Sequence, residues 1–265
     1  MRMPRLRIAD VLPPIIPRAV TYLRRHLLER FGPLHSHRAL IHPFDAVPRD
    51  LDVKWVLDVG ANKGDVALSA LISYPDCQVI CFEPAKETFA LLTQRMQRFS
   101  SRVHLFNIAL SDQDGTGEIH LTTFHGANSI LPQSKFHQHL NPHVRELRTE
   151  GIELRRLDGL APGLPSQFID IMKIDVEGYE LSVLQGGLEF MKTQVDVIII
   201  EISLMRDTSW EVQSFFSLFA LLKDSGFRLI NIIDLQHAPT YADNPNLLLT
   251  QMDCVFRRKD NLINV

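Results

Sequence analysis

Residues 56–64 read V-L-D-V-G-A-N-K-G, and residues 65–74 continue as D-V-A-L-S-A-L-I-S-Y. The apolar run over 55–59 predicts a buried β-strand that stops at Gly60, and the apolar spacing that follows predicts a helix over 64–73. Glycine lets the backbone turn sharply and approach a ligand without a Cβ in the way. A strand that turns through glycine into a helix is typical of a doubly wound α/β sheet, whose ligands bind at the carboxyl ends of the strands.

The alternation of strands and helices continues along the chain. Further strands are predicted over 78–82, 102–107, 168–174 and 195–201, with helices over 86–98 and 178–190. Two last strands, 227–234 and 251–257, are joined by a segment too short and too rich in Pro and Asn for a covering helix, so they are expected to pair antiparallel. The fold class predicted is therefore α/β, a doubly wound seven-stranded mostly parallel sheet with an antiparallel last strand.

The chain divides into an extension and one domain. Residues 1–50 are basic and proline-rich with a short helix near 19–30, and residues 51–265 form the domain, with a polar lid insert near 122–150. The basic face of the helix is expected either to contact a membrane surface or a partner through residues 1–30, or to pack on the domain itself.

Composition restricts the partners. The formal net charge of -3 provides no global basic field, and no basic aromatic strip is present, so nucleic acid is not expected as a partner. No apolar stretch reaches the length of a membrane span, and Asp10 and the Pro13-Pro14 pair interrupt any signal-peptide core, so a cytoplasmic location is expected.

The glycine turn departs from the dinucleotide fingerprint G-x-G-x-x-G. Asn62 holds the middle glycine position, and Asp65 in the first helical turn would repel a pyrophosphate. Glu83 ends the second strand, where an acidic side chain accepts hydrogen bonds from both ribose hydroxyls. The residues thus favour a nucleoside cofactor over NAD, with an exposed strand-end glutamate as the structural alternative.

Charged residues occupy the ends of the fourth and fifth strands. Lys173 and Asp175 share one face of an otherwise apolar strand, and Glu201 lies at the same level of the next. Asp175 and Glu201 are expected to hold a divalent cation such as Mg²⁺, or to act as general base and hydrogen-bond acceptor for a substrate hydroxyl. The alternative is a structural ion pair of Lys173 with Asp175 or with Glu177.

The insert carries His125, His137, His139 and His143. Their spacing invites a zinc interpretation, but no Cys or Asp ligand lies nearby, so a solvated lid is favoured, with His125 as a candidate base. Trp210, after the fifth strand, is read either as a wall of the acceptor site or as a core residue.

Five motifs in order resemble the FkbM family of S-adenosylmethionine-dependent methyltransferases, over roughly residues 53–258. They are D-V-G-A-N-K-G (58–64), F-E-P (82–84), N-I-A-L-S-D-Q-D-G (107–115), L-D-G-L (157–160) and I-D-I-M-K-I-D-V-E-G-Y-E (169–180). The resemblance implies the Rossmann-like class I methyltransferase sheet, with S-adenosylmethionine as cofactor.

The resemblance also implies roles for individual positions. Asp58, Gly60 and Asn62 would form the methionine pocket, Glu83 would hold the ribose, Ala109 would border the adenine, and Asp175 would face the cofactor. G-A-N-S-I-L at 126–131 resembles a small-Ser-Ser-Leu segment of the family, with Asn128 in place of the first serine.

The expected activity is O-methylation (EC 2.1.1.-) of a hydroxyl on a saccharide or small natural product, with Lys173, Asp175, Glu201 and His125 as catalytic candidates. Oxygen is favoured because no N-P-P-Y-like N-methylation motif occurs. Two alternatives stay open: a non-catalytic nucleoside-binding adaptor that uses the N-terminal arm, and an NAD-dependent oxidoreductase.

Overall fold

The structure is a computed structural model that describes residues 42–133, 138, 141–203, 211–237 and 249–259. The predicted helix near 19–30, the histidines at 137 and 139, and Trp210 lie outside the described residues. Among the helices formed by described residues, none is both long and apolar enough to cross a bilayer.

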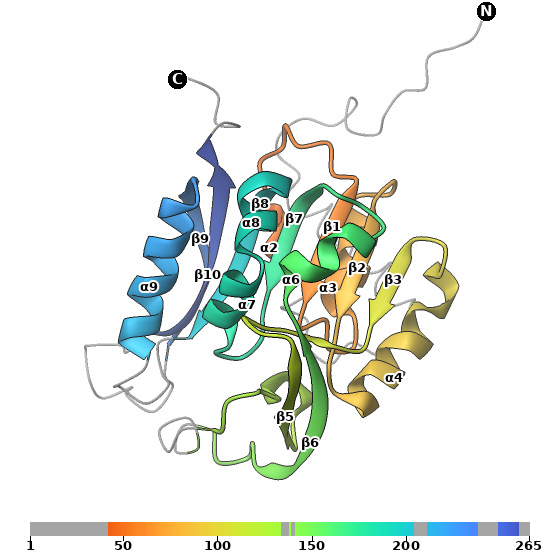
Figure 1. Ribbon diagram of the computed structural model, residues 1–265, viewed down its shortest axis with the longest axis vertical. Helices are drawn as coiled ribbons and strands as arrows, with labels where there is room; N and C mark the ends of the chain where they lie inside the picture. Colours follow the sequence, from red (N-terminus) through yellow and green to blue (C-terminus); the bar gives the residue numbers. More distant parts are fainter. Residues whose placement is uncertain (1–41, 134–137, 139–140, 204–210, 238–248, 260–265) are drawn as a thin grey trace, which may run out of the picture.

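A seven-stranded sheet forms the centre of the molecule, with strand order β3-β2-β1-β7-β8-β10-β9 (Figure 1). Its strands are β1 (Trp55–Val59), β2 (Gln78–Phe82), β3 (Val103–Phe106), β7 (Ile169–Ile174), β8 (Val195–Ser203), β9 (Phe227–His237) and β10 (Leu249–Arg258). All neighbours pair parallel except β10, which is antiparallel to both β8 and β9. The predicted sheet is confirmed.

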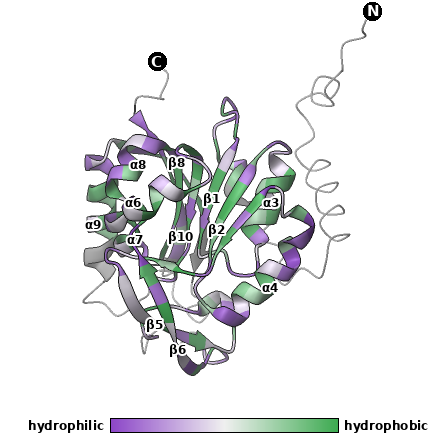
Figure 2. Cartoon of the chain, turned by 45° about the vertical axis from the view of Figure 1, so that its right-hand side comes forward, coloured by the Kyte–Doolittle hydropathy of each residue, from purple (hydrophilic) through white to green (hydrophobic). Residues whose placement is uncertain are grey.

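Helices cover both faces of this sheet. Side chains of α2 (His42–Asp45), α3 (Asp65–Ser73) and α4 (Lys86–Met96) pack on one face, and those of α6 (Leu157–Leu160), α7 (Glu180–Gly186), α8 (Leu188–Gln194) and α9 (Glu211–Asp224) pack on the other. Figure 2 shows β1 and β2 in the colours of hydrophobic residues, while α4 also carries hydrophilic ones. Continuous apolar strands are required because both faces are buried.

Residues 109–155, which include the insert, form a second, smaller sheet. β5 (Gly115–Thr122) pairs antiparallel with β6 (Glu146–Arg155), and β6 pairs parallel with the short β4 (Ala109–Leu110). This hairpin projects beyond the carboxyl ends of the parallel strands (Figure 1). The hairpin therefore lies at the edge of the main sheet where a ligand is expected.

The single helix expected over 178–190 is wrong, because two helices occupy this stretch. α7 ends at Gly186 and α8 begins at Leu188. At Gly186 the chain meets the loop after β4 so closely that an added Cβ would lie 1.8 Å from the carbonyl oxygen of Ser111. This close contact between the two backbones requires glycine at 186, and the non-helical Gly187, with φ -118° and ψ 21°, separates the two helices.

Candidate active site

A cavity of about 490 Å³ opens at the carboxyl ends of β1, β2 and β7. Its walls come from the turn after β1, the end of β2, the Ala109 segment, the insert around His125 and Ser129, and the loop after β7. This volume is in the range of small-molecule and cofactor sites. The position is the one that the doubly wound sheet predicts for its ligand.

The turn after β1 places bare backbone against this cavity. Gly60 has φ +82°, and its N–H donates to the carbonyl oxygen of Phe82 at 3.0 Å, as the N–H of Ala61 does at 2.9 Å. An added Cβ at Gly60 would lie 1.9 Å from the carbonyl oxygen of Asp175. Gly60 is therefore required both for its left-handed backbone and for the close contact between the turn and the end of β7.

Gly64 packs against α4. It caps α3 with φ +84°, and a Cβ there would lie 2.7 Å from both Leu92 and Met96. The two glycines of the motif thus have separate functions, one at the cavity and one in helix packing.

Glu83 lies in the cavity wall and is only 6% exposed. Its carboxylate accepts hydrogen bonds from the N–H of Asn62 at 2.9 Å and of Ala85 at 3.0 Å. Burial raises the pKa of Glu83 to about 7, although these two hydrogen bonds act to lower it. The alternative of an exposed strand-end glutamate is therefore wrong, since the side chain is held in place at the cavity.

Asn62 and Ala109 also lie at the cavity, as the family resemblance implies. The Oδ1 atom of Asn62 is buried and has no hydrogen-bond partner among the described residues. A buried acceptor without a partner costs free energy unless a donor reaches it, and the amino group of a methionine moiety is such a donor. Together with the bare backbone at Gly60, this acceptor fits S-adenosylmethionine.

Asp58 does not line the cavity. It is 1% exposed, in register with Cys81 of β2 and Lys173 of β7. Burial raises the pKa of Asp58 to about 7, with Lys173 opposing the shift and Asp175 adding to it. Asp58 therefore lies within the sheet behind the turn and not in the cavity wall, so a direct contact with a ligand there, as the resemblance implies, is wrong.

Two residues of the G-A-N-S-I-L segment fix the insert, and one of them, Ser129, ties it to the loop after β7. Asn128 accepts a hydrogen bond from the N–H of Thr122 at 2.8 Å. The hydroxyl of Ser129 donates to the carbonyl oxygen of Glu177 at 2.8 Å and accepts from the N–H of Leu131 at 3.0 Å. The asparagine that replaces the family serine thus closes the turn of the insert, and the serine that remains holds the Glu177 backbone.

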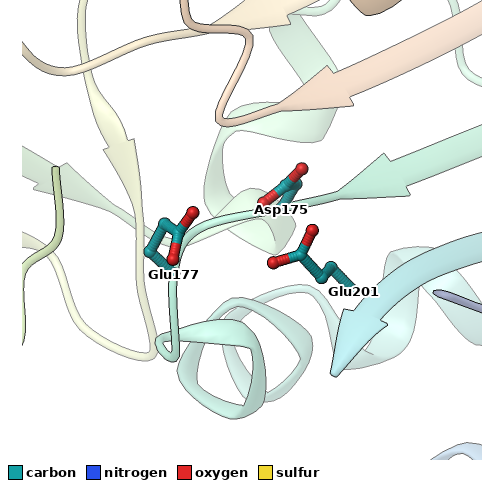
Figure 3. A group of neighbouring side chains, drawn as sticks. All are labelled: Asp175, Glu177 and Glu201. Carbon is teal, nitrogen blue, oxygen red and sulfur yellow. The ribbon is translucent and has the colours of Figure 1, made fainter. Parts of the chain in front are cut away.

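Three carboxylates meet beside this loop. Oxygen atoms of Asp175, Glu177 and Glu201 lie within 4.8 Å of one another (Figure 3). Asp175 and Glu177 line the cavity, whereas Glu201 approaches from the end of β8. Burial raises the pKa of Glu201 well above its ordinary range, and the charges of Asp175 and Glu177 raise it further. The structure thus brings together the two carboxylates expected from the sequence and adds Glu177.

Glu177 was expected only as a partner of Lys173. It adopts φ +56°, a conformation uncommon for a residue other than glycine, and Gly178 follows it at φ +99°. The carboxylate of Glu180 accepts the N–H groups of Val176 at 3.2 Å and Gly178 at 2.9 Å, which fixes this loop. The E-G pair of the motif is the sequence signal that could have placed Glu177 in the cluster.

Lys173 lies beneath the carboxylates and is 2% exposed. Its Nζ is 3.4 Å from Asp175 and 3.4 Å from Asp253 of β10. Burial acts to lower the pKa of Lys173, but Asp175 and Asp253 outweigh it and raise the pKa above its ordinary value. The expected Lys173–Asp175 ion pair is present, and Lys173 serves as a buried cation outside the cavity wall.

Sequence reasoning missed Asp253. It is 9% exposed and in register with Glu201 across the antiparallel pair. Its one signal in the sequence is an acidic residue within the apolar strand Q-M-D-C-V-F, the same anomaly that singled out Lys173.

His125 lies in the cavity wall, on the short 3-10 helix His125–Ala127 of the insert. Its Nδ1 is 3.3 Å from the hydroxyl of Thr88. Burial and the positive charge of Lys63 lower the pKa of His125, so its imidazole is neutral at pH 7. A neutral imidazole at the cavity is suited to a general base.

Comparison with known proteins identifies the family. A model of the methyltransferase FkbM domain matches residues 58–229. The 2-O-methyltransferase NoeI of Sinorhizobium fredii is 31% identical over 140 residues, which cover 51% of this chain and 57% of NoeI. The 31-O-demethyl-FK506 methyltransferase FkbM of Streptomyces tacrolimicus is 26% identical over 216 residues, which cover 72% of this chain and 77% of that protein.

Among solved structures, the methyltransferase FkbM of Methylobacillus flagellatus aligns with a TM-score of 0.49 at 16% identity, covering 82% of this chain and 47% of that one. The chain thus spans little more than half of NoeI and less than half of the solved FkbM chain. Because the family model covers more than half of its length, the chain belongs to the FkbM methyltransferase family, as its sequence motifs predicted.

Proposed function

We propose that this protein is an S-adenosylmethionine-dependent O-methyltransferase that acts on a hydroxyl of a saccharide or small natural product. The observation that carries the proposal is one cavity that combines the nucleoside-type wall of Gly60, Asn62 and Glu83 with the carboxylates Asp175 and Glu177. The names of two relatives, the 2-O-methyltransferase NoeI and the 31-O-demethyl-FK506 methyltransferase FkbM, support oxygen as the acceptor atom.

The cofactor supplies a methyl group on a sulfonium centre. Within the cavity, Glu83 would accept from the ribose hydroxyls, Asn62 would accept from the amino group, and Ala109 would border the adenine. Transfer to oxygen needs an oriented hydroxyl that has lost its proton, so correct placement provides much of the rate. Asp175, whose backbone meets Gly60 and whose carboxylate lines the cavity, would orient that hydroxyl, and the neutral His125 would act as base in the tautomer whose Nε2 carries no proton.

We further propose that Asp175, Glu177 and Glu201 hold Mg²⁺. Carboxylate oxygens are the ligands that this ion prefers, and three carboxylates converge here. A bound divalent cation would neutralise the mutual repulsion of the carboxylates and lower the pKa of a coordinated acceptor hydroxyl.

The acidic lining also supports the exclusion of nucleic acid. Asp65, Glu83, Asp175 and Glu177 line the cavity and would repel a phosphate backbone. Contact of residues 1–30 with a membrane surface or a partner stays a prediction, because those residues lie outside the described part of the chain.

Calorimetric titration with S-adenosylhomocysteine, and of a second sample with NAD, tests the cofactor. Saturable binding of S-adenosylhomocysteine and no heat of binding from NAD are the expected results. NAD binding alone would favour an oxidoreductase, and an absence of binding to either would contradict the proposed function. Asp175→Asn is then expected to lose methyl transfer in a screen of sugar and polyketide acceptors while it keeps its affinity for S-adenosylhomocysteine. The matched control is Asp76→Asn, since Asp76 is exposed and outside the cavity.

Metal binding is tested without the reaction, by following Mn²⁺ as a paramagnetic substitute for Mg²⁺. Wild-type protein is expected to bind the ion and Glu201→Gln to lose most of its affinity, while Glu189→Gln, an exposed control, behaves as wild type. Equal Mn²⁺ affinity in all three proteins would show that Glu201 does not hold the ion and would contradict this part of the proposal.

A further inference from the structure

We propose that Lys63 and His125 form a carboxylate-binding corner of the cavity, in which Lys63 supplies the charge and His125 an additional hydrogen bond. The inference rests on the proposed function, because it concerns the ligands of the same cavity. It assigns a binding role to Lys63, a residue that the family motifs leave without one.

Lys63 is distinguished by the charges around it. It is half-buried, and it is the only Lys or Arg among the described residues that line the cavity. Four carboxylates share that lining: Asp65, Glu83, Asp175 and Glu177. An anionic ligand group is therefore repelled along most of the wall and attracted to one place, the side chain of Lys63.

The carboxylate closest in sequence to Lys63 is already paired. Arg95 of α4 forms an ion pair with Asp65 at 2.5 Å, and its guanidinium also donates to the carbonyl oxygen of Lys63 at 3.1 Å. Arg95 thus fixes the backbone at Lys63 while it neutralises Asp65. The ammonium of Lys63 forms no ion pair with any of the described residues, which leaves its charge available to a ligand.

His125 reaches the same corner from the insert. The positive charge of Lys63 acts on its imidazole, and Glu87 of α4 acts on it in the opposite direction. Thr88 of α4 lies 3.3 Å from Nδ1 and steadies the ring. Lys63 lines the cavity from the turn after β1, and His125 lines it from the insert. The ammonium of Lys63 can donate to an anion, and the neutral imidazole can donate from Nε2 in the tautomer whose Nδ1 accepts from the Thr88 hydroxyl.

The ligand group that fits is a carboxylate. One source is the α-carboxylate of the cofactor, and the other is an acidic group of the acceptor, such as that of a uronic acid. Both would form a charge-assisted hydrogen bond with Lys63. The two sources are separated by measuring the affinities of ligands with and without the carboxylate.

Calorimetry with S-adenosylhomocysteine and with 5′-methylthioadenosine, which lacks the amino-acid part, tests the first source. Lys63→Met is expected to weaken S-adenosylhomocysteine binding by about ten- to a hundredfold and to leave 5′-methylthioadenosine binding unchanged. Lys63→Arg should restore most of the lost affinity. Lys86→Met is the matched control, because Lys86 is an exposed lysine at the start of α4 and outside the cavity lining.

Glucuronate and glucose, titrated in the presence of saturating S-adenosylhomocysteine, test the second source. Loss of glucuronate binding in Lys63→Met, with S-adenosylhomocysteine binding unchanged, would assign the corner to an acidic acceptor. A double-mutant cycle that combines Lys63→Met with His125→Ala is expected to show non-additive losses of affinity for the carboxylate ligand whose binding Lys63→Met weakens.

Two results would overturn the proposal. In one, Lys63→Met leaves the affinities for both S-adenosylhomocysteine and glucuronate unchanged. In the other, it weakens S-adenosylhomocysteine and 5′-methylthioadenosine by the same factor, which indicates damage to the turn rather than loss of a carboxylate partner. If the wild-type protein binds neither S-adenosylhomocysteine nor 5′-methylthioadenosine, the proposed function is contradicted. The titration with glucuronate would still test whether Lys63 and His125 bind a carboxylate.

Discussion

The carbonyl oxygen of Asp175 lies 1.9 Å from the position that a Cβ on Gly60 would occupy. The N–H of Asp175 also donates to the carbonyl oxygen of Val59 at 3.0 Å, so the ends of β1 and β7 are in direct contact. The turn after β1 and the loop that carries Asp175 and Glu177 are therefore packed together through their backbones, and a change in the backbone of one is expected to displace the other.

Gly60→Ala is expected to lower the free energy of unfolding by at least about 2 kcal/mol, because alanine is disfavoured at φ +82° and its Cβ would displace the Asp175 carbonyl. It is also expected to abolish S-adenosylhomocysteine binding. Urea unfolding and calorimetry measure the two effects. Gly163→Ala is the control, since a Cβ there meets nothing within 4 Å. Equal stability of the two variants would contradict the steric argument.

Lys173→Met should destabilise the fold by about 3–5 kcal/mol, because it leaves Asp175 and Asp253 without their shared cation. Adding Asp253→Asn to Lys173→Met should recover part of the loss, so that the two substitutions are non-additive in urea unfolding. Lys192→Met removes an exposed pair with Glu189 and should cost less than about 1 kcal/mol. Strict additivity of the Lys173 and Asp253 substitutions would show that this buried pair is not coupled.

Asp58 should make the protein less stable as the pH rises. Its pKa is raised from the ordinary value of 3.8 to about 7, so the folded state holds a proton that the unfolded chain releases at lower pH. The stabilisation is fully present below pH 3.8 and is lost as the pH rises through about 7.

The predicted loss from Asp58 is about 2–3 kcal/mol between about pH 5 and about pH 8. Asp58→Asn cannot lose this proton, so its stability relative to wild type should improve by that amount over the same interval. Urea unfolding at both pH values measures the difference, with exposed Asp76→Asn as the control. A constant difference between Asp58→Asn and wild type would show that the carboxyl has its ordinary pKa in the folded state.

Local sequence patterns predicted most of the fold. The strands over 55–59 and 78–82 were predicted residue for residue, because uninterrupted apolar runs bounded by polar residues leave little choice for a buried parallel strand. Glycine at 60 and a carboxylate at 83 could likewise be placed at the edge where the cavity opens, since the turn and the strand end that follow have fixed positions in such a sheet. The need for glycine at 186 could not be predicted, because it depends on the Ser111 backbone, which is distant in sequence.

The sequence by itself determined the family, the sheet and the edge at which the cavity opens, because these follow from periodicity and from motifs whose residues are close along the chain. Only the tertiary structure decided which charges meet. Asp253 reaches Lys173 across a separation of 80 residues, and Glu177 joins Asp175 and Glu201 through a left-handed backbone turn. Electrostatic interactions depend on distance in space and on burial, and neither of these is encoded in the spacing of residues along the chain.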